Sequence, residues 1–146
     1  MAFGPNPPPI QAYICVKNGS DAIAFYETAF GAICTFKKMA NDGRRVMHAN
    51  LDIYGSEVML HDEFPEFGGI LMSPTTRGGA SVGIHINLPK PADVDVAVER
   101  AEKGGAAVVF KPEDTFWGAR YGQVRDPSGH IWAFNAPLKS PPMNCE

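Results

Sequence analysis

The stretch WGARYGQVRDPSGHIWAFN, at residues 117–135, decides the fold of this chain. Side chains alternate in character along residues 121–125 and again along residues 130–135, with aromatic and β-branched residues among them. This is the pattern of half-buried strands. The DPSG segment between them has Asp first, Pro second and Gly last, as a type I turn favours. The stretch therefore predicts a strand, a tight turn and a second strand.

Two aromatic rings and a guanidinium lie close together at the start of this stretch: Trp117, Arg120 and Tyr121. Such a group could hold a planar or anionic ligand by stacking and charge. Alternatively, Trp117 packs at the end of a sheet or at a dimer seam, and Arg120 is a solvated charge at a strand edge. The sequence leaves both interpretations open.

Upstream of the hairpin, strand and helix patterns occur twice in the same order. In the first half, Ile23, Tyr26 and Phe30 form a helical stripe that ends at Gly31, between a strand at residues 10–16 and strands at residues 32–37, 46–53 and 57–61. The second half has a strand at residues 81–88, a helix that begins near residue 91 and ends at Gly104, and a strand at residues 107–110 before the hairpin. Gly31 and Gly104 are 73 residues apart (104 − 31), and so are Glu57 and His130 (130 − 57).

We therefore expect an α+β fold in a single domain, residues 1–146, built of two β-α-β-β-β units at about residues 10–62 and 81–137. The linker loop between them, residues 62–80, is rich in Pro and Gly but also contains large apolar residues such as Phe64 and Phe67. A loop of this length could be a lid, a dimer arm or a simple connection, and we favour the connection.

Composition excludes several classes of protein. The net charge of −3 over 146 residues argues against a nucleic-acid binder, which needs clustered cations. Three widely spaced cysteines, Cys15, Cys34 and Cys145, favour free thiols in a reducing compartment. The first nine residues lack the features of a signal peptide, and no apolar run approaches the length of a membrane span. We expect a cytoplasmic protein without a membrane or nucleic-acid partner.

Several motifs in both halves carry a family resemblance. They are the helix AIAFYETAFGA at residues 22–32, HAN at 48–50, GSEVML at 55–60, FWG at 116–118 and DPSGHIW at 126–132. With these motifs the chain resembles the vicinal oxygen chelate superfamily (glyoxalase I, fosfomycin- and bleomycin-resistance proteins, extradiol dioxygenases), and within it the PhnB-like group. The resemblance spans roughly residues 10–137. It implies a glyoxalase/bleomycin-resistance-like fold whose sheets form a cup, completed in a homodimer.

The resemblance also implies where a divalent metal would bind, at one position in the first strand and one in the last strand of each unit. These positions fall at Gln11, at His85 or (with a different gap before the helix) Gly83, and at Leu60 and Ala133. Leu60 and Ala133 have no donor atoms, and Gln11 with His85 alone is fewer than the three protein ligands of a catalytic zinc site. Strand parity places Glu57 and His61 on the face opposite Leu60. We therefore expect no complete metal site and no cofactor.

The histidines allow different interpretations. His85 shares a strand face with polar neighbours, so it is either a catalytic base or ligand or a hydrogen-bonded sheet residue. His48 lies in an apolar strand and is expected to be structural. His130 follows the DPSG turn and is expected to anchor it.

Two functional hypotheses follow. The first is a protein that binds a small aromatic or hydrophobic molecule in its cup; the expected ligand-binding residues are Gln11, Tyr13, His85, Trp117, Arg120 and Tyr121. The alternative is a metal-dependent lyase, isomerase or dioxygenase-type enzyme that acts on a small metabolite, with His85 as the candidate catalytic residue.

Overall fold

The computed structural model describes residues 7–139 of the chain. Residues 1–6 and Cys145 lie outside the described residues. The expectations about a signal peptide and about a free thiol at Cys145 therefore concern residues beyond this range. None of the helices in residues 7–139 is long and apolar enough to cross a bilayer.

Two units with the same order of elements make up the structure. The first contains β1 (Tyr13–Cys15), α1 (Gly19–Phe30), β2 (Ile33–Met39), β3 (Val46–Ile53) and β4 (Ser56–His61). The second contains β5 (Gly83–Asn87), α3 (Pro91–Lys103), β6 (Ala107–Asp114), β7 (Ala119–Arg125) and β8 (Ile131–Pro137). The sheets have the strand orders β1-β4-β3-β2 and β5-β8-β7-β6, and in each the first strand runs parallel to the last. The predicted pair of β-α-β-β-β units is confirmed.

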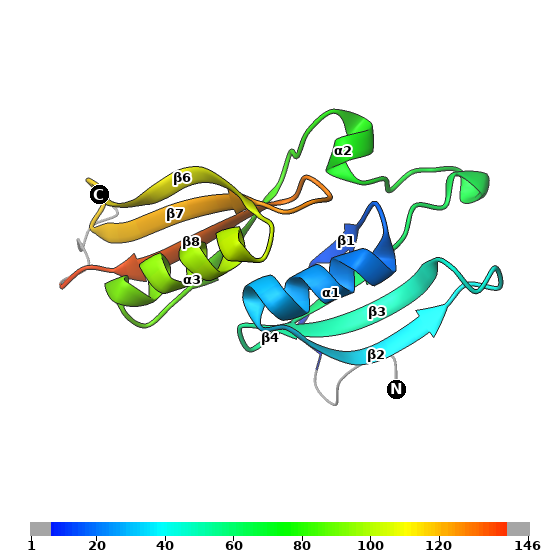
Figure 1. Cartoon of the computed structure of the whole chain (residues 1–146), viewed down its shortest axis with the longest axis horizontal. Helices are drawn as coiled ribbons and strands as arrows, with labels where there is room; N and C mark the ends of the chain where they lie inside the picture. Colours follow the sequence, from blue (N-terminus) through cyan, green and yellow to red (C-terminus); the bar gives the residue numbers. More distant parts are fainter. Residues whose placement is uncertain (1–6, 140–146) are drawn as a thin grey trace.

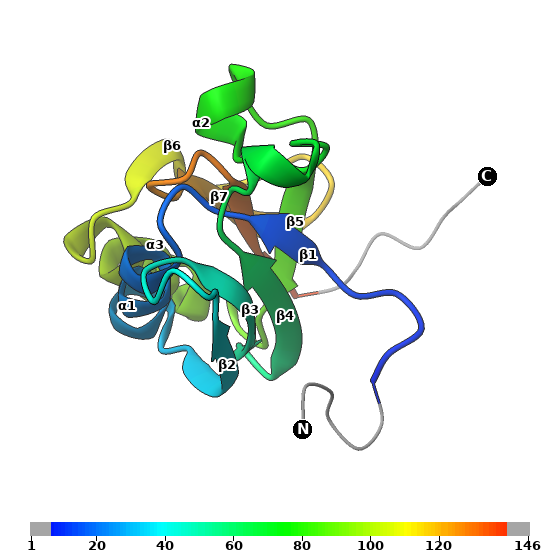
Figure 2. The same cartoon turned by 90° about the vertical axis from the view of Figure 1, so that its right-hand side faces the viewer.

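Helices α1 and α3 contact each other and lie on one side of the two sheets (Figures 1 and 2). They cover one continuous core that includes Tyr26, Leu60, Trp132 and Phe134. Gly104 at the end of α3 is required by close approach, because a Cβ there would lie 2.7 Å from the Cβ of Ala29. The helices therefore join the two units through their packing.

The face of each sheet that is turned away from α1 and α3 is called its open face. Alternation along the strands places on the first open face Tyr13, His48, Asn50, Met59 and His61, and on the second His85, Tyr121, Gln123, Ala133 and Asn135. Leu60 instead faces the core, with 1% of its surface exposed. The predicted parity of Glu57 and His61, opposite to Leu60, is confirmed.

Strand register relates the two open faces. Across the first sheet Tyr13 pairs with Met59, Met59 with Asn50 and Asn50 with Phe36. Across the second sheet the same row consists of His85, Ala133, Gln123 and Phe110. Corresponding residues of the two rows are 72, 74, 73 and 74 positions apart in the sequence. The separation differs from strand to strand because the loops that connect each strand set its register. A single offset of 73 was therefore wrong for the last strand, where Ala133 corresponds to Met59 and not to Leu60.

The DPSG turn is the point at which the second unit is fastened to the first. Gly129 N–H donates to Asp126 O at 2.9 Å, which closes the predicted turn. The carboxylate of Asp126 is 3% exposed and accepts from Trp132 Nε1 at 2.8 Å and from Tyr26 O–H at 2.5 Å. Since Tyr26 belongs to α1, this buried carboxylate connects the two units.

His130 anchors the same turn, as predicted. Its backbone N–H donates to Asp126 Oδ1 at 3.0 Å, and its Nε2 lies 2.7 Å from Cys15 O in β1. Ser128 adds a third link, because its hydroxyl accepts from Lys17 N–H at 3.0 Å. The DPSG turn and His130 thus have a mainly structural role, which is to connect the two units.

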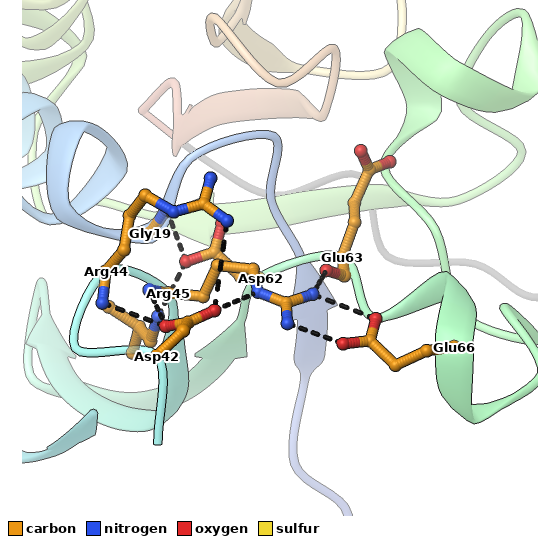
Figure 3. A network of polar contacts seen from close by, with 8 residues as sticks. Gly19, Asp42, Arg44, Arg45, Asp62, Glu63 and Glu66 are labelled. Carbon is orange, nitrogen blue, oxygen red and sulfur yellow. Dashed lines mark hydrogen bonds and ion pairs between the residues drawn. The ribbon is translucent and has the colours of Figure 1, made fainter. Parts of the chain in front are cut away.

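The 62–80 linker contains a short 3₁₀ turn (Pro65–Phe67) and the single-turn helix α2 (Pro74–Arg77). Figure 3 shows Arg45, the residue before β3, between Asp42 and Glu66. Its guanidinium also donates to Glu63 O at 3.1 Å and lies 4.3 Å above the Phe64 ring. These contacts hold the linker against the first unit.

The far end of the linker is held as well. Glu63 accepts from Ser73 N–H at 3.0 Å and forms an ion pair with Lys17 at 3.4 Å. Thr75 donates from its hydroxyl and its N–H to Ser128 O, at 2.8 and 3.1 Å. These contacts favour a fixed connection over a mobile lid.

Candidate functional site

A chain of polar side chains crosses the first open face. Nε2 of His48 lies 2.6 Å from Oδ1 of the buried Asn50, and Nδ1 of His48 lies 3.3 Å from the hydroxyl of Tyr13. The Tyr13 ring also stands edge-on to the His61 ring, with 4.8 Å between centroids. Residues from β1, β3 and β4 therefore meet around one phenol. His48, which was expected to be structural, takes part in this group.

Hydrogen-bond partners determine which ring nitrogen of each histidine carries the proton. An amide or carbonyl oxygen can only accept, so the nitrogen that faces it must be N–H. This assigns Nε2–H to His48, His85 and His130, and Nδ1–H to His61, which faces Asp62 O at 2.6 Å. In the neutral ring the other nitrogen keeps its lone pair. His48 Nδ1 accepts from Tyr13, and His61 Nε2 has the lone pair of a base.

Gln11 precedes β1, which begins three residues later than the sequence pattern predicted, excluding Ile10 to Ala12. Its amide Nε2 donates to Glu57 Oε2 at 2.7 Å and to Glu57 O at 3.2 Å. The amide is thus engaged with β4 at one end of the first open face. Gln11 therefore lies before the sheet begins and makes contacts separate from those of Tyr13.

The second open face carries a different arrangement. Nε2 of His85 lies 3.0 Å from Asn87 Oδ1, and Gln123 Nε2 donates to the Tyr121 hydroxyl at 2.6 Å. The Tyr121 ring lies near both His85 and Trp117, with centroids 6.3 and 5.6 Å apart. The structure thus brings together three of the predicted ligand-binding residues: His85, Trp117 and Tyr121.

Arg120 does not join them. Its guanidinium forms ion pairs with Asp95 of α3 at 2.8 Å and with Asp114 of β6 at 3.2 Å. Alternation along β7 points its side chain to the helix side, away from Tyr121. Arg120, which was expected to bind an anionic ligand by its charge, therefore links α3 to the second sheet instead.

A cavity of about 330 Å³ is lined by residues of β1, by Ile84 of β5 and by the end of the linker. Figure 2 shows β1 and β5 next to each other. Its walls are mainly apolar and include Ile14, Leu71, Met72, Val82 and Ile84. The linker residues Leu71 and Met72 form part of this wall, which is a role that the sequence did not reveal. Of the predicted ligand-binding residues, Tyr13 lines this cavity.

Burial alters two ionisable groups beside the cavity. Burial, with a smaller contribution from Cys15, raises the pKa of the Tyr13 phenol, so it stays protonated at neutral pH and acts as a donor. Burial, with the nearby Glu63 and Asp62 charges, raises the pKa of the Cys15 thiol to about 12. Cys15 is therefore a small apolar wall residue and not a nucleophile.

The side chains at the expected metal-ligand positions do not fit a catalytic divalent metal. Leu60 lies in the core, Ala133 presents a methyl group, and the Gln11 amide is bonded to Glu57. Within residues 7–139 no three His, Cys, Asp or Glu side chains come together as a group that could hold an ion. A catalytic zinc site normally has three protein ligands. The expected absence of a cofactor remains a prediction.

Comparison with known proteins identifies the family. Residues 9–134 match the model of the Glyoxalase/Bleomycin resistance protein/Dioxygenase superfamily, so the chain belongs to this superfamily. An uncharacterized protein of Mycobacterium bovis is 40% identical over 138 residues, which cover 94% of this chain and 88% of the relative.

Two solved structures show the same fold. A glyoxalase/bleomycin resistance protein/dioxygenase from Nocardioides aligns with a TM-score of 0.68 and 21% identity, covering 97% of this chain and 92% of that one. A PhnB protein from Bacillus cereus, titled a putative 3-demethylubiquinone-9 3-methyltransferase, aligns with a TM-score of 0.64 and 14% identity, covering 88% of this chain and 99% of that one. At these identities the likeness concerns the fold alone.

Proposed function

We propose that this protein binds a small, hydrophobic or aromatic molecule at the junction of its two sheets. The cavity between β1 and β5 carries the proposal, because its volume of about 330 Å³ and its mainly apolar wall match the usual site for a small organic ligand. Among residues 7–139, β1 and β5 are the edge strands of their sheets, and Cys15 O at the β1 edge is already bonded to His130 Nε2.

A planar ligand suits this cavity. Met72 and Leu71 can pack on ring faces, and the Tyr13 phenol can donate a hydrogen bond at the edge. His85, Trp117, Tyr121 and Gln11 do not line this cavity, and their role in binding stays a prediction for the open faces. The homodimer, the cytoplasmic location and the single domain likewise stay predictions.

The test uses 1-naphthol as a probe of the cavity. We expect the melting temperature to rise with probe concentration, because a ligand that binds the native state alone stabilises it. Val82→Trp fills the cavity from an exposed position and should weaken binding at least tenfold.

The matched control is Val96→Trp on the solvent side of α3, where the side chain is 65% exposed. It should bind the probe like the unaltered protein. Equal binding by Val82→Trp and the unaltered protein would place the probe elsewhere and contradict the proposal.

A further inference from the structure

The first open face holds a phenol between two imidazoles, and binding in the cavity gives no reason for this group. Its members come from three strands: Tyr13 from β1, His48 from β3 and His61 from β4. Phe36 and Phe64 border it, with ring centroids 6.1 Å from His48 and 6.5 Å from His61. The group thus combines a proton donor, a proton acceptor and aromatic walls on one exposed face.

We propose that Tyr13 and His61 form a proton-transfer site that acts on a small aromatic carbonyl compound with a hydrogen on the carbon next to the carbonyl. His48 and Asn50 are positioning residues for Tyr13. Of these residues, Tyr13 also lines the cavity, and His48, Asn50 and His61 do not.

The hydrogen bonds on His61 make it the base. Its Nδ1–H donates to Asp62 O at 2.6 Å, which fixes the ring and leaves the lone pair on Nε2. The edge-on contact with Tyr13 places this imidazole beside the phenol. A base beside a hydrogen-bond donor is the pair of groups that proton abstraction next to a carbonyl requires.

Tyr13 supplies the donor. Its hydroxyl is held by His48 Nδ1 at 3.3 Å, which is long for a hydrogen bond, so the hydroxyl can turn to a substrate oxygen at small cost. Asn50 Oδ1 holds the other side of His48 and keeps Nδ1 as the acceptor. The raised pKa of Tyr13 keeps its proton available as negative charge develops.

The step balances without a co-reactant. His61 Nε2 takes the proton from the carbon, the C–H electron pair forms a C=C bond, and the carbonyl π pair moves to the oxygen, which Tyr13 stabilises. Return of a proton from His61 to carbon restores the keto form. In heavy water the imidazolium exchanges its proton for a deuteron, so the substrate gains deuterium at that carbon.

The experiment follows this exchange by proton NMR in D₂O with phenylpyruvate and 2-hydroxyacetophenone, using the full chain. The unaltered protein should exceed an equal concentration of free imidazole with at least one of them. His61→Gln and Tyr13→Phe should each slow the enzyme-dependent exchange by about 100-fold, the size of a general acid–base or oxyanion contribution. Tyr54→Phe is the matched control and should leave the rate unchanged.

His48 is tested by replacement with a residue that keeps the acceptor. His48→Asn should retain most of the rate, because an amide oxygen can accept from the Tyr13 hydroxyl, whereas His48→Leu should lose about tenfold. A purely structural role would not separate these two variants at equal melting temperature.

Folding and binding are measured beside the exchange. His61→Gln should melt like the unaltered protein and still bind 1-naphthol, so loss of exchange with retained binding separates this proposal from the cavity. The proposal is overturned if the unaltered protein exchanges neither compound faster than imidazole, or if folded His61→Gln exchanges as fast as the unaltered protein.

Discussion

In the first sheet Tyr13, Met59 and Asn50 occupy the row that His85, Ala133 and Gln123 occupy in the second. Each row ends on a phenylalanine, Phe36 or Phe110, and each includes an amide on its third strand. The two units therefore share a scaffold down to the register of single residues, and their differences lie in side-chain chemistry.

The amides show this difference best. In the first sheet Asn50 accepts from an imidazole that in turn accepts from a phenol. In the second sheet Gln123 donates to the phenol of Tyr121, which stands where His48 stands in the first. The first arrangement leaves a base and a donor side by side, and the second uses its phenol as an acceptor. The two units thus share the sheet and differ in the direction of its hydrogen bonds.

The fastening between the units should give the largest effect. Asp126→Ala leaves the Tyr26 hydroxyl and the Trp132 indole N–H without their buried acceptor. We expect a loss of about 3–5 kcal/mol in the free energy of unfolding, measured with urea. Asp114→Ala, which removes an exposed partner of Arg120, should cost less than about 1 kcal/mol. Equal losses would contradict the role of Asp126.

The contact between α1 and α3 should come next. Gly104→Ala would place a Cβ 2.7 Å from that of Ala29, so we expect the helices to shift and the protein to lose about 1–3 kcal/mol of stability. Gly83→Ala is the control, because a Cβ there meets only Ile131 O, at 3.9 Å. A thermal melt of both variants that showed no difference would indicate that the two helices do not pack closely.

The linker should respond to pH with a smaller effect. Hydrogen bonds from Arg45 lower the pKa of Glu66, in the linker, to about 2. Hydrogen bonds from backbone N–H groups lower the pKa of Asp42 below its usual range. A carboxylate whose pKa is lower in the folded protein than in the unfolded chain stabilises the fold at pH values above its unfolded pKa, about 4.3. This stabilisation is lost as the pH falls towards the pKa of the folded state. We expect the protection of linker amides from hydrogen exchange to fall between about pH 4.3 and 2.

The control for the linker is Arg45→Leu, which removes the partner of both carboxylates. In this variant the linker should already exchange faster at neutral pH and show little further change on acidification. Protection that falls equally in both proteins would assign the effect to general acid unfolding.

Much of the fold could be predicted from sequence, because local rules govern it. The stripe of Ile23, Tyr26 and Phe30 and the glycine after it define α1, and the DPSG turn defines the last hairpin. Strand bounds were less certain, since β1 begins at Tyr13 although the apolar pattern begins at Ile10. Pairing with β4 decides where such a short strand starts, and pairing is not a local property.

The candidate site was harder to predict for the same reason. His48 lies among apolar neighbours in sequence, and only the register of β1 against β3 and β4 brings Tyr13 and His61 to it. Strand parity was the one available signal, because it places His48, Asn50 and His61 on the same face as Tyr13 once the pairing is known. The acceptor of Arg120 was missed because Asp95 lies on a helix in a different layer.

The protonation of the histidines tests the central claim most directly. Nitrogen-15 NMR of the imidazole rings near neutral pH distinguishes Nε2–H from Nδ1–H in each residue. The hydrogen bonds predict Nε2–H for His48 and Nδ1–H for His61, so that one imidazole holds Tyr13 and the other is free to act as a base. A proton on Nδ1 of His48, or on Nε2 of His61, would contradict the account of the first open face.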